Sequence, residues 1–406
     1  MKSGIIRLLN ALLMVMLVGA LVQAPMAQAA SVRLGIDRID DYLALFAGKR
    51  VGLITNQTGV NSVLESSIDI LYEKTKVTAL YSPEHGLRGS AEAGAAVGSA
   101  TDGKTGLPVY SLYGDTRKPS APMLADIDIL CFDIQDVGAR FYTYVSTLAL
   151  AMEAARENDR QVVVFDRPNP IGGVMVEGPI LKPGQESFIG MYPIPIRHGL
   201  TVGELALLIN DRFGIGCKLT VIPMSGWQRE MHWRDTGLPW VMTSPNIPTP
   251  DTALVYPGIG MLGSTNLSEG IGTTRPFELV GAAWLNAEAA AARLNQAGLP
   301  GVHFRPAWFT PRFGPHSGIQ QSGVQIHITD RYAYEAVSTG LTILTVMKEL
   351  GDGQFGFQSA AMFDLAVGEA NLRLGLESPA ELLARWHQEA ARFRHESRTY
   401  HLYPAK

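Results

Sequence analysis

One short segment of the sequence places a carboxylate and an imidazole together in a rigid turn. The segment 82–86 (SPEHG) follows an apolar segment that ends at Tyr81. Proline restricts the backbone before Glu84 and glycine permits an unusual dihedral angle after His85, which suits a side chain held in a cleft. Hydrolysis of a glycosidic bond needs a carboxyl group that protonates the leaving oxygen, and burial favours that protonated form. Glu84 is therefore the main catalytic candidate; the structural alternatives are a buried ion pair with Arg88 and a helix N-terminal acid.

Polar side chains also follow three other apolar segments that we expect to be strands, namely 50–55, 127–132 and 161–165. In an open parallel sheet, ligands bind at the carboxyl ends of the strands, so these clusters and the one with Glu84 predict a single cleft. Taken singly, each cluster could instead cap a helix or shape a turn. The candidates that follow the three segments are Asn56, Asp133, Asp136, Arg140, Tyr142, Asp166 and Asn169.

Segments rich in glycine and proline in the middle of the chain carry further polar candidates. Arginine is suited to bidentate binding of a carboxylate, and asparagine and glutamate suit sugar hydroxyls. These candidates are Arg197, His198, Asn246, Glu269 and Arg275. A glycosidase also needs a second carboxylate as base or nucleophile, for which the sequence leaves four alternatives open: Asp133, Asp136, Asp166 and Glu269.

These observations predict two groups of site residues and no bound metal or cofactor. The catalytic group comprises Glu84, His85, Asp136 and Glu269. The substrate-binding group comprises Asn56, Asp133, Arg140, Tyr142, Asp166, Asn169, Arg197, His198, Asn246 and Arg275. The histidines lack the H-x-x-x-H spacing of a zinc site, and no G-x-S-x-G motif of a serine hydrolase is present. The segment 258–263 matches G-x-G-x-x-G, but it lies late in the chain and Pro257 interrupts it, which argues against dinucleotide binding.

The elements that must position these residues alternate between strand and helix in the first half of the chain. Several strand segments are apolar on both faces, which is typical of a parallel sheet covered by helices. The pattern predicts a Rossmann-like, doubly wound α/β domain with a mostly parallel sheet. The expected strands are 50–55, 77–81, 109–112, 127–132, 161–165 and 218–223, and the expected helices are 64–74, 144–157 and 202–213.

The pattern changes in the second half of the chain. Residues 167–274 are rich in glycine and proline, and we expect them to form site loops, with a short strand-like stretch at 254–256. A second, smaller α+β domain is expected to follow. Its predicted helices are 286–297, 333–350 and 380–395, and its predicted strands lie near 302–304 and 323–329. The predicted domains are therefore 31–282 and 283–406.

The N-terminus has the layout of a secretory signal peptide that covers residues 1–30. Lys2 and Arg7 precede an apolar stretch, and a small-x-small cleavage site follows at 27–29. We expect a secreted, periplasmic protein with no stable membrane insertion after cleavage. A formal charge of −4 without a basic run argues against nucleic acid as a partner. The two cysteines, Cys131 and Cys217, form no disulfide scaffold, and the sequence leaves open whether they are bridged.

Several of these motifs together resemble one known family, the NamZ-type exo-β-N-acetylmuramidases, first described as a domain of unknown function. The resemblance covers nearly the whole chain after the leader and rests on seven strings in order: GLITNQTGV, YSPEHGLRG, FDIQDVGARFYTY, VFDRPNPIGG, PIRHGLTVGELA, TSPNIPTPDT and STNLSEGIGTTRPFE. It implies a Rossmann-like domain, a smaller C-terminal domain and a cleft between them. It also implies release of N-acetylmuramic acid from the non-reducing ends of peptide-free glycan, with no cofactor.

The family's candidate catalytic glutamate corresponds to Glu84 in this sequence. Two positions depart from the family pattern. Ile271 replaces the arginine of the usual S-E-G-R-G, and a cysteine often found before a late strand is absent around 320–322. The missing arginine bears on substrate range more than on fold.

The resemblance and the residues leave two main hypotheses. The first is a muramidase, which needs a cationic contact for the lactyl carboxylate of N-acetylmuramic acid, with Arg140, Arg197 and Arg275 as candidates. The alternative is a non-catalytic periplasmic binding protein for muropeptide sugars. A pair of carboxylates beside one bound sugar distinguishes the enzyme, because a binding protein has no need of it. Another wall hydrolase, such as an amidase or esterase, lacks its expected motifs.

Overall fold

The computed structural model describes residues 32–89, 91–92, 94–96 and 98–405, which belong to one compact unit. The predicted signal peptide at 1–30 lies outside the described residues. Within the described part of the chain, no helix is long and apolar enough to cross a membrane.

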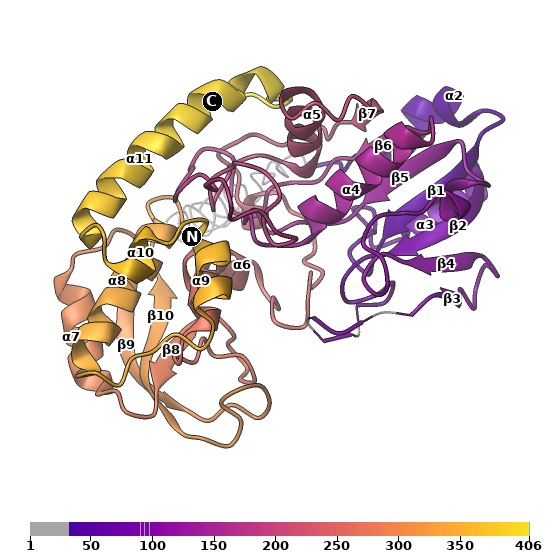
Figure 1. Cartoon of the computed structure of the whole chain (residues 1–406). Coiled ribbons are helices and arrows are strands. Elements are labelled where there is room, and N and C mark those ends of the chain that lie inside the picture. The colour runs from indigo at the N-terminus through magenta and orange to yellow at the C-terminus, as the bar shows by residue number, and fades with distance from the viewer. Residues whose placement is uncertain (1–31, 90, 93, 97, 406) are drawn as a thin grey trace, which may run out of the picture. The chain divides into compact units, whose positions relative to one another are not determined.

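A seven-stranded sheet forms the larger layer of the molecule (Figure 1). It is mostly parallel, as predicted, and all its strands except the edge strand at Ala100–Thr101 correspond to predicted ones. Its order is β3-β4-β2-β1-β5-β6-β7, and every neighbouring pair is parallel except β3 with β4. The strands are β1 (Arg50–Thr55), β2 (Lys76–Ser82), β3 (Ala100–Thr101), β4 (Pro108–Ser111), β5 (Ile129–Asp133), β6 (Gln161–Phe165) and β7 (Lys218–Ile222). The chain runs outward in both directions from β1 and β5, so the topological switch point, where α/β sheets bind ligands, lies between these two strands.

Helices cover both faces of this sheet, which explains why its strands are continuously apolar. Alternate residues of β5 belong to different core clusters: Leu130 and Phe132 to one, Ile129 and Cys131 to the other. The helix α3 (Ser67–Lys74) packs on β1 and β2, whereas α4 (Tyr144–Glu157) and α5 (Val202–Arg212) pack on β5, β6 and β7. The capping box that the sequence indicates at Thr201 and Glu204 starts α5.

A smaller antiparallel sheet and its helices form the C-terminal part, which confirms the predicted α+β layer. The sheet order is β8-β10-β9, with β8 (Leu279–Ala282), β9 (Val302–Phe309) and β10 (Gln321–Ile328). The helices are α6 (Pro250–Ile259), α7 (Ala287–Gln296), α8 (Ala336–Leu350), α9 (Ala360–Val367), α10 (Asn371–Leu374) and α11 (Pro379–Glu396). The strand β8 ends at Ala282, before the predicted domain boundary, yet it pairs with β10 of the smaller sheet. The domain boundary between residues 282 and 283 stays a prediction.

The predicted strand-like stretch at 254–256 is wrong, because these residues lie in α6. A short apolar segment does not distinguish a strand from a buried helix, and α6 is buried along most of its length. The G-x-G-x-x-G segment has a packing role here: a Cβ on Gly258 would lie 1.9 Å from the carbonyl oxygen of Ala336 in α8. A Cβ on Gly340 would lie 2.2 Å from the Gly258 carbonyl oxygen, so two glycines allow α6 and α8 to cross closely.

Both cysteines are free and buried, so they are not bridged. Cys131 lies in β5, and Cys217 directly precedes β7. Burial raises the pKa of the Cys217 thiol to about 11, which leaves it protonated at neutral pH.

Candidate functional site

The Glu84 side chain lies just beyond the carboxyl end of β2 and is held by two donors. The backbone N–H of Gly94 donates to its Oε1 (2.8 Å), and the hydroxyl of Thr143 donates to its Oε2 (2.6 Å). Thr143 directly precedes α4, so the helix start and the loop after β2 together orient the carboxyl group. The side chain is 8% exposed and has no cationic partner in the described chain, where Arg88 pairs with Asp102 instead. The alternative of an ion pair between Glu84 and Arg88 is therefore wrong.

His85 fixes the turn that carries Glu84. Its backbone has a φ of 69°, a left-handed conformation that is uncommon for residues other than glycine. Its Nδ1 lies 2.7 Å from the carbonyl oxygen of Ala91, and since a carbonyl only accepts, Nδ1 donates. The backbone carbonyl of His85 accepts from the Ala91 N–H in return. These two bonds close the loop beside Glu84.

Three tyrosines form an aromatic wall near this carboxyl group. The ring of Tyr142 meets those of Tyr144 and Tyr256 edge-on, with centroids 4.9 and 5.9 Å apart. Tyr144 begins α4, Tyr142 lies two residues before it, and Tyr256 lies on α6. The wall therefore combines residues from the N-terminal and C-terminal halves of the chain. The sequence indicated only Tyr142 of the three.

Asp136 is a buried carboxyl group with one free oxygen. Its Oδ1 accepts from the N–H of Gly138 (2.7 Å), whereas Oδ2 has no hydrogen-bond partner among the described residues. Burial raises the pKa of Asp136 to about 7. A carboxyl group with an ordinary pKa would be ionised at neutral pH, so Asp136 is unusual in being partly protonated there.

Glu269 reaches the same region from the C-terminal half. Its carboxyl oxygen packs beside Gly263, since a Cβ at Gly263 would come within 3.2 Å of Oε1. The side chain is partly exposed and makes no hydrogen bond to another residue in the described part of the chain. Burial of the carboxyl group raises the pKa of Glu269 to about 7. Glu269 is thus a half-buried carboxyl group without a side-chain partner among the described residues, and it can be protonated near neutral pH.

The carboxyl groups of Glu84, Asp136 and Glu269 lie in the region around Tyr256. Burial raises the pKa of Tyr256 above its usual range, and a neighbouring Tyr142 adds to the shift. The three carboxyl groups also contribute, which places each of them within electrostatic range of this one hydroxyl. Side chains that are far apart in the sequence thus share one region of the molecule. This arrangement of three carboxyl groups beside aromatic rings is the candidate active site.

Of two further predicted binding residues, Asn246 lies where a ligand could meet it, whereas Asn56 is buried. Asn56 follows β1 at the switch point, and its Oδ1 accepts from the backbone N–H and hydroxyl of Thr58 (2.9 and 2.6 Å). Asn246 is partly exposed on the loop before α6 and makes no hydrogen bond within the described residues. The structure leaves the amide group of Asn246 available to a ligand.

Three other predicted residues have their polar atoms occupied by the protein. Asp133 accepts two hydrogen bonds from the Arg167 guanidinium (2.6 and 2.8 Å) in a fully buried pair. Asp166 accepts from four donors, including the hydroxyl of Tyr403 (2.5 Å) near the C-terminus. Asn169 bridges the backbone of its own loop to that of Leu200. We therefore interpret all three as parts of the scaffold rather than as ligand contacts.

Two of the predicted arginines are likewise used within the fold. The guanidinium of Arg140 donates to four carbonyl oxygens, those of Pro179, Ile194, Ala366 and Val367. It thereby ties the loop 179–194 to α9. Arg197 is fully buried and pairs with Glu177 at 2.6 Å, while Glu177 in turn accepts from the first turn of α8. Both guanidinium groups are buried and bonded within the fold.

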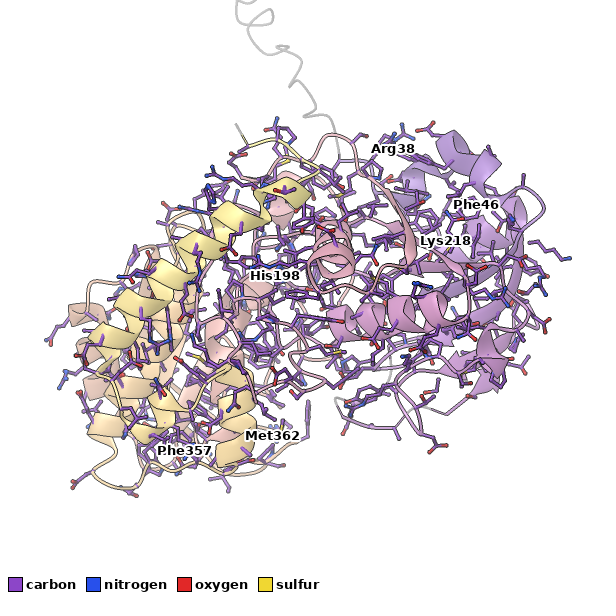
Figure 2. The ribbon with its side chains drawn as sticks, turned by 45° about the horizontal axis from the view of Figure 1, so that its top comes forward. Arg38, Phe46, His198, Lys218, Phe357 and Met362 are labelled. Atoms are coloured by element: carbon purple, nitrogen blue, oxygen red, sulfur yellow. The ribbon has the colours of Figure 1, made fainter. Side chains whose placement is uncertain are left out.

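His198 also lies in the interior (Figure 2). Its Nδ1 accepts from the Leu200 N–H at 3.2 Å. Burial, and then the charge of Arg140, lowers the pKa of His198 to about 3, so the ring is neutral. Its position supports a structural role.

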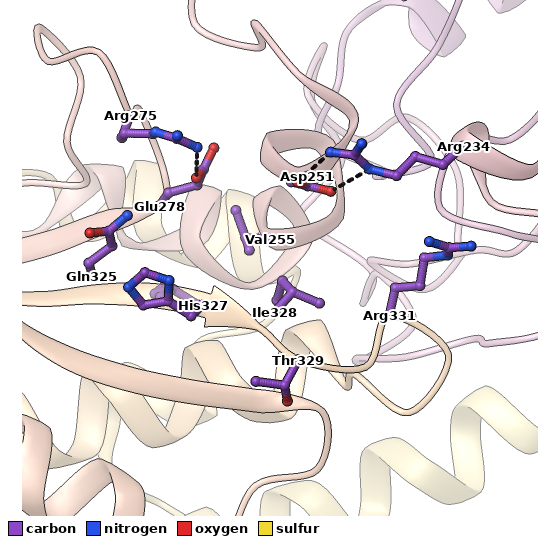
Figure 3. A pocket seen from close by; sticks show the side chains of 11 residues that line it. Arg234, Asp251, Val255, Arg275, Glu278, Gln325, His327, Ile328, Thr329 and Arg331 are labelled. Carbon is purple, nitrogen blue, oxygen red and sulfur yellow. Dashed lines mark hydrogen bonds and ion pairs between the residues drawn. The ribbon is translucent and has the colours of Figure 1, made fainter.

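Arg275 lies in a separate hollow that also contains residues of α6 and β10 (Figure 3). The hollow measures about 370 Å³ and is lined by charged side chains, including Arg234 and Arg331. Arg275 pairs with Glu278 at 2.9 Å, and Arg234 pairs with Asp251 at 2.7 Å. The lining residues do not include any of the three carboxyl groups of the candidate active site. Arg275 thus lines a hollow to which none of the three carboxyl groups contributes.

Thr143, Tyr113 and Tyr256 are site residues that the sequence reasoning missed. Burial, and then the adjacent Glu84 carboxylate, raises the pKa of Tyr113 to about 12, which places its hydroxyl beside that carboxylate. Thr143 lies within the quoted motif FDIQDVGARFYTY and could have been selected from it. No motif in the sequence pointed to Tyr256, because residues 254–256 were expected to be a strand rather than part of a helix. Among the described residues, no group of three or more potential metal ligands occurs.

Two family models cover most of the chain. Residues 51–251 match the N-terminal model of the exo-β-N-acetylmuramidase NamZ, and residues 254–403 match its C-terminal model. The chain is 52% identical over 355 residues to the peptidoglycan β-N-acetylmuramidase NamZ of Bacillus subtilis (strain 168), covering 87% of this chain and 86% of that protein.

Two solved structures share the fold. Both are of DUF1343-family proteins from Bacteroides fragilis NCTC 9343. One is 41% identical with a TM-score of 0.87, covering 92% of this chain and 99% of the other. The second is 32% identical with a TM-score of 0.77, covering 93% of this chain and 100% of the other.

Proposed function

Because the chain belongs to the exo-β-N-acetylmuramidase NamZ family, we propose that it is a glycoside hydrolase that releases N-acetylmuramic acid from the non-reducing ends of peptidoglycan fragments. The observation that carries this proposal is the match to both NamZ family models and to a peptidoglycan β-N-acetylmuramidase that is 52% identical. Glu84 and Glu269, two carboxyl groups without a cationic partner in the described chain, fit that activity. Glycosidic cleavage needs two carboxyl groups with different tasks beside one sugar, and a sugar-binding protein does not.

We assign the proton donor to Glu269. Its pKa of about 7 keeps a proton available at neutral pH, and no other described residue competes for the carboxyl group. Donation of that proton to the glycosidic oxygen would leave the carboxylate charged and release the leaving sugar as an alcohol. The sequence alone suggested Glu84 for this role, but its contacts favour a different one.

Glu84 is assigned as the second carboxylate. Thr143 and Gly94 hold its two oxygens in one orientation, which preorganises the group beside the anomeric carbon. Asp136 has an unpartnered Oδ2, but this atom is buried, so we assign it no direct contact with the sugar. His85 positions Glu84 by closing its loop, rather than by contacting the substrate.

The test uses two substrates whose leaving groups differ in their need for a proton. Glu84→Gln is expected to abolish hydrolysis of both a MurNAc-terminated disaccharide and an activated aryl β-N-acetylmuraminide. Glu269→Gln is expected to lose about 10²- to 10⁴-fold on the disaccharide and much less on the aryl glycoside, whose leaving group needs no acid. The matched control is Glu288→Gln, which alters an exposed acid on α7.

The outcomes separate the proposals clearly. Saturable binding without any product from the wild-type protein would indicate a binding protein and contradict hydrolysis. Full activity of Glu84→Gln on both substrates would remove Glu84 from the mechanism. An equal loss on both substrates for Glu269→Gln would contradict its assignment as the acid.

We also propose that residues 1–30 direct secretion and that the enzyme works in the periplasm. A basic start, an apolar stretch and a small-x-small site support this. N-terminal sequencing of the protein from cell fractions tests it: a chain that begins near residue 30 or 31 in the periplasmic fraction is expected. An intact Met1 in the cytoplasmic fraction would contradict it.

A further inference from the structure

None of the three arginines that the sequence suggested has a guanidinium free to bind the carboxylate of the substrate. If the proposed function holds, the terminal sugar carries a lactyl ether on O3, and its carboxylate is the main chemical difference from N-acetylglucosamine. Arg140 and Arg197 are buried and bonded within the fold. Arg275 pairs with Glu278 in the hollow beside α6 and β10. Another cation must therefore distinguish the two sugars.

Arg117, on the loop after β4, is an exposed arginine without a carboxylate partner among the described residues. Its guanidinium lies over two rings, 4.2 Å from the centroid of Phe188 and 5.3 Å from that of Tyr113. The two rings also contact each other, with centroids 5.9 Å apart. Stacking uses the face of the guanidinium and leaves its in-plane N–H groups free to donate.

This cluster of Arg117, Tyr113 and Phe188 lies next to the candidate active site. The hydroxyl of Tyr113 is beside the Glu84 carboxylate and within electrostatic range of Arg117 as well. Phe188 lies on the loop 179–194, which Arg140 holds in place through the carbonyl oxygens of Pro179 and Ile194. The arginine is thus carried on a fixed aromatic platform at one side of the catalytic carboxylate.

We propose that Arg117 binds the lactyl carboxylate of the terminal N-acetylmuramic acid and so selects this sugar over N-acetylglucosamine. The lactyl group is attached to C3, two ring atoms from the anomeric carbon, and therefore extends sideways from a sugar whose anomeric carbon faces Glu84. A guanidinium with free in-plane donors can bind the carboxylate through two parallel hydrogen bonds. The buried Arg140 then acts indirectly, as a positioning residue for Phe188.

The experiment measures binding of three free sugars by calorimetry, alongside KM and kcat for an aryl β-N-acetylmuraminide. The sugars are N-acetylmuramic acid, its methyl ester, which lacks the charge, and N-acetylglucosamine. Arg117→Gln is expected to weaken binding of N-acetylmuramic acid and raise KM by about 10- to 100-fold, the range for hydrogen bonds to a charged group, with kcat within a few-fold of wild type. Arg117→Lys is expected to retain part of the affinity, because the charge remains without the bidentate geometry.

The uncharged sugars provide the decisive comparison. The wild-type protein should bind the methyl ester as weakly as Arg117→Gln binds N-acetylmuramic acid. Arg117→Gln should bind the acid and its methyl ester with equal affinity. Arg275→Gln is the matched control and should bind like wild type. Unchanged affinity of Arg117→Gln for the acid, or an equal loss for all three sugars, would overturn the inference. Absence of hydrolysis by the wild-type protein would contradict the proposed function instead, and the sugar comparison would still decide the role of Arg117.

Discussion

The buried pair of Asp133 and Arg167 allows a quantitative test of the division between scaffold and site. The two side chains are 0% and 3% exposed, and the guanidinium donates to both carboxylate oxygens and to the carbonyl oxygen of Val60. Arg167→Met removes three hydrogen bonds and leaves the Asp133 carboxylate buried without a countercharge. Loss of one partner of a buried pair costs about 3–5 kcal/mol, so the free energy of unfolding should fall by this amount.

The double variant Asp133→Leu/Arg167→Met should recover much of that loss, because two apolar side chains leave no unpaired buried charge. The control is Lys218→Met, which breaks an exposed pair with Asp159 and should leave the stability unchanged within error. Urea unfolding followed by tryptophan fluorescence gives the free energies, and the slope of each curve checks that the transition remains comparable.

Two results would refute this reasoning. A loss below about 1 kcal/mol for Arg167→Met would mean that the pair is not a desolvated, structural interaction. A stable Asp133→Asn variant with a strongly raised KM would return Asp133 to the substrate-binding residues. In the expected case, variants that remain folded keep the KM of the wild-type protein.

Three further predictions concern the carboxyl groups and the helix crossing. Because Glu269 must be protonated to act and its pKa is about 7, kcat/KM should fall as pH rises through about 7, and a flat profile to pH 9 would contradict this. Asp136 has a pKa of about 7 in the folded protein against an ordinary 3.8, so its contribution to the free energy of unfolding is fully present below about pH 4 and is lost as pH rises through 7. Asp136→Asn should therefore raise the free energy of unfolding at pH 8 by up to about 4 kcal/mol and leave it unchanged at pH 4, as measured by urea unfolding. Gly340→Ala should lower the free energy of unfolding by about 1–3 kcal/mol, since the new Cβ would lie 2.2 Å from the Gly258 carbonyl oxygen. An unchanged melting temperature would contradict this.

The sequence by itself determined the larger sheet and the position of Glu84. Strands apolar on both faces are a local property of the chain, and strand ends carry polar residues wherever a parallel sheet opens to a ligand. Residues 50–55, 144–157 and 161–165 form the predicted elements with the predicted bounds. The family could also be identified, because its motifs are long and occur in order.

Only the tertiary structure decided which polar side chains are free to act. Asp133 and Asp136 look alike in the sequence, but Arg167 neutralises one and leaves the other with an unpartnered oxygen. Arg140 and Arg117 differ in the same way: four distant carbonyl groups surround the first, whereas two aromatic rings support the second and leave its donors open. The physical reason is that desolvation and pairing depend on groups supplied by distant segments, and their positions are set by how helices and loops pack.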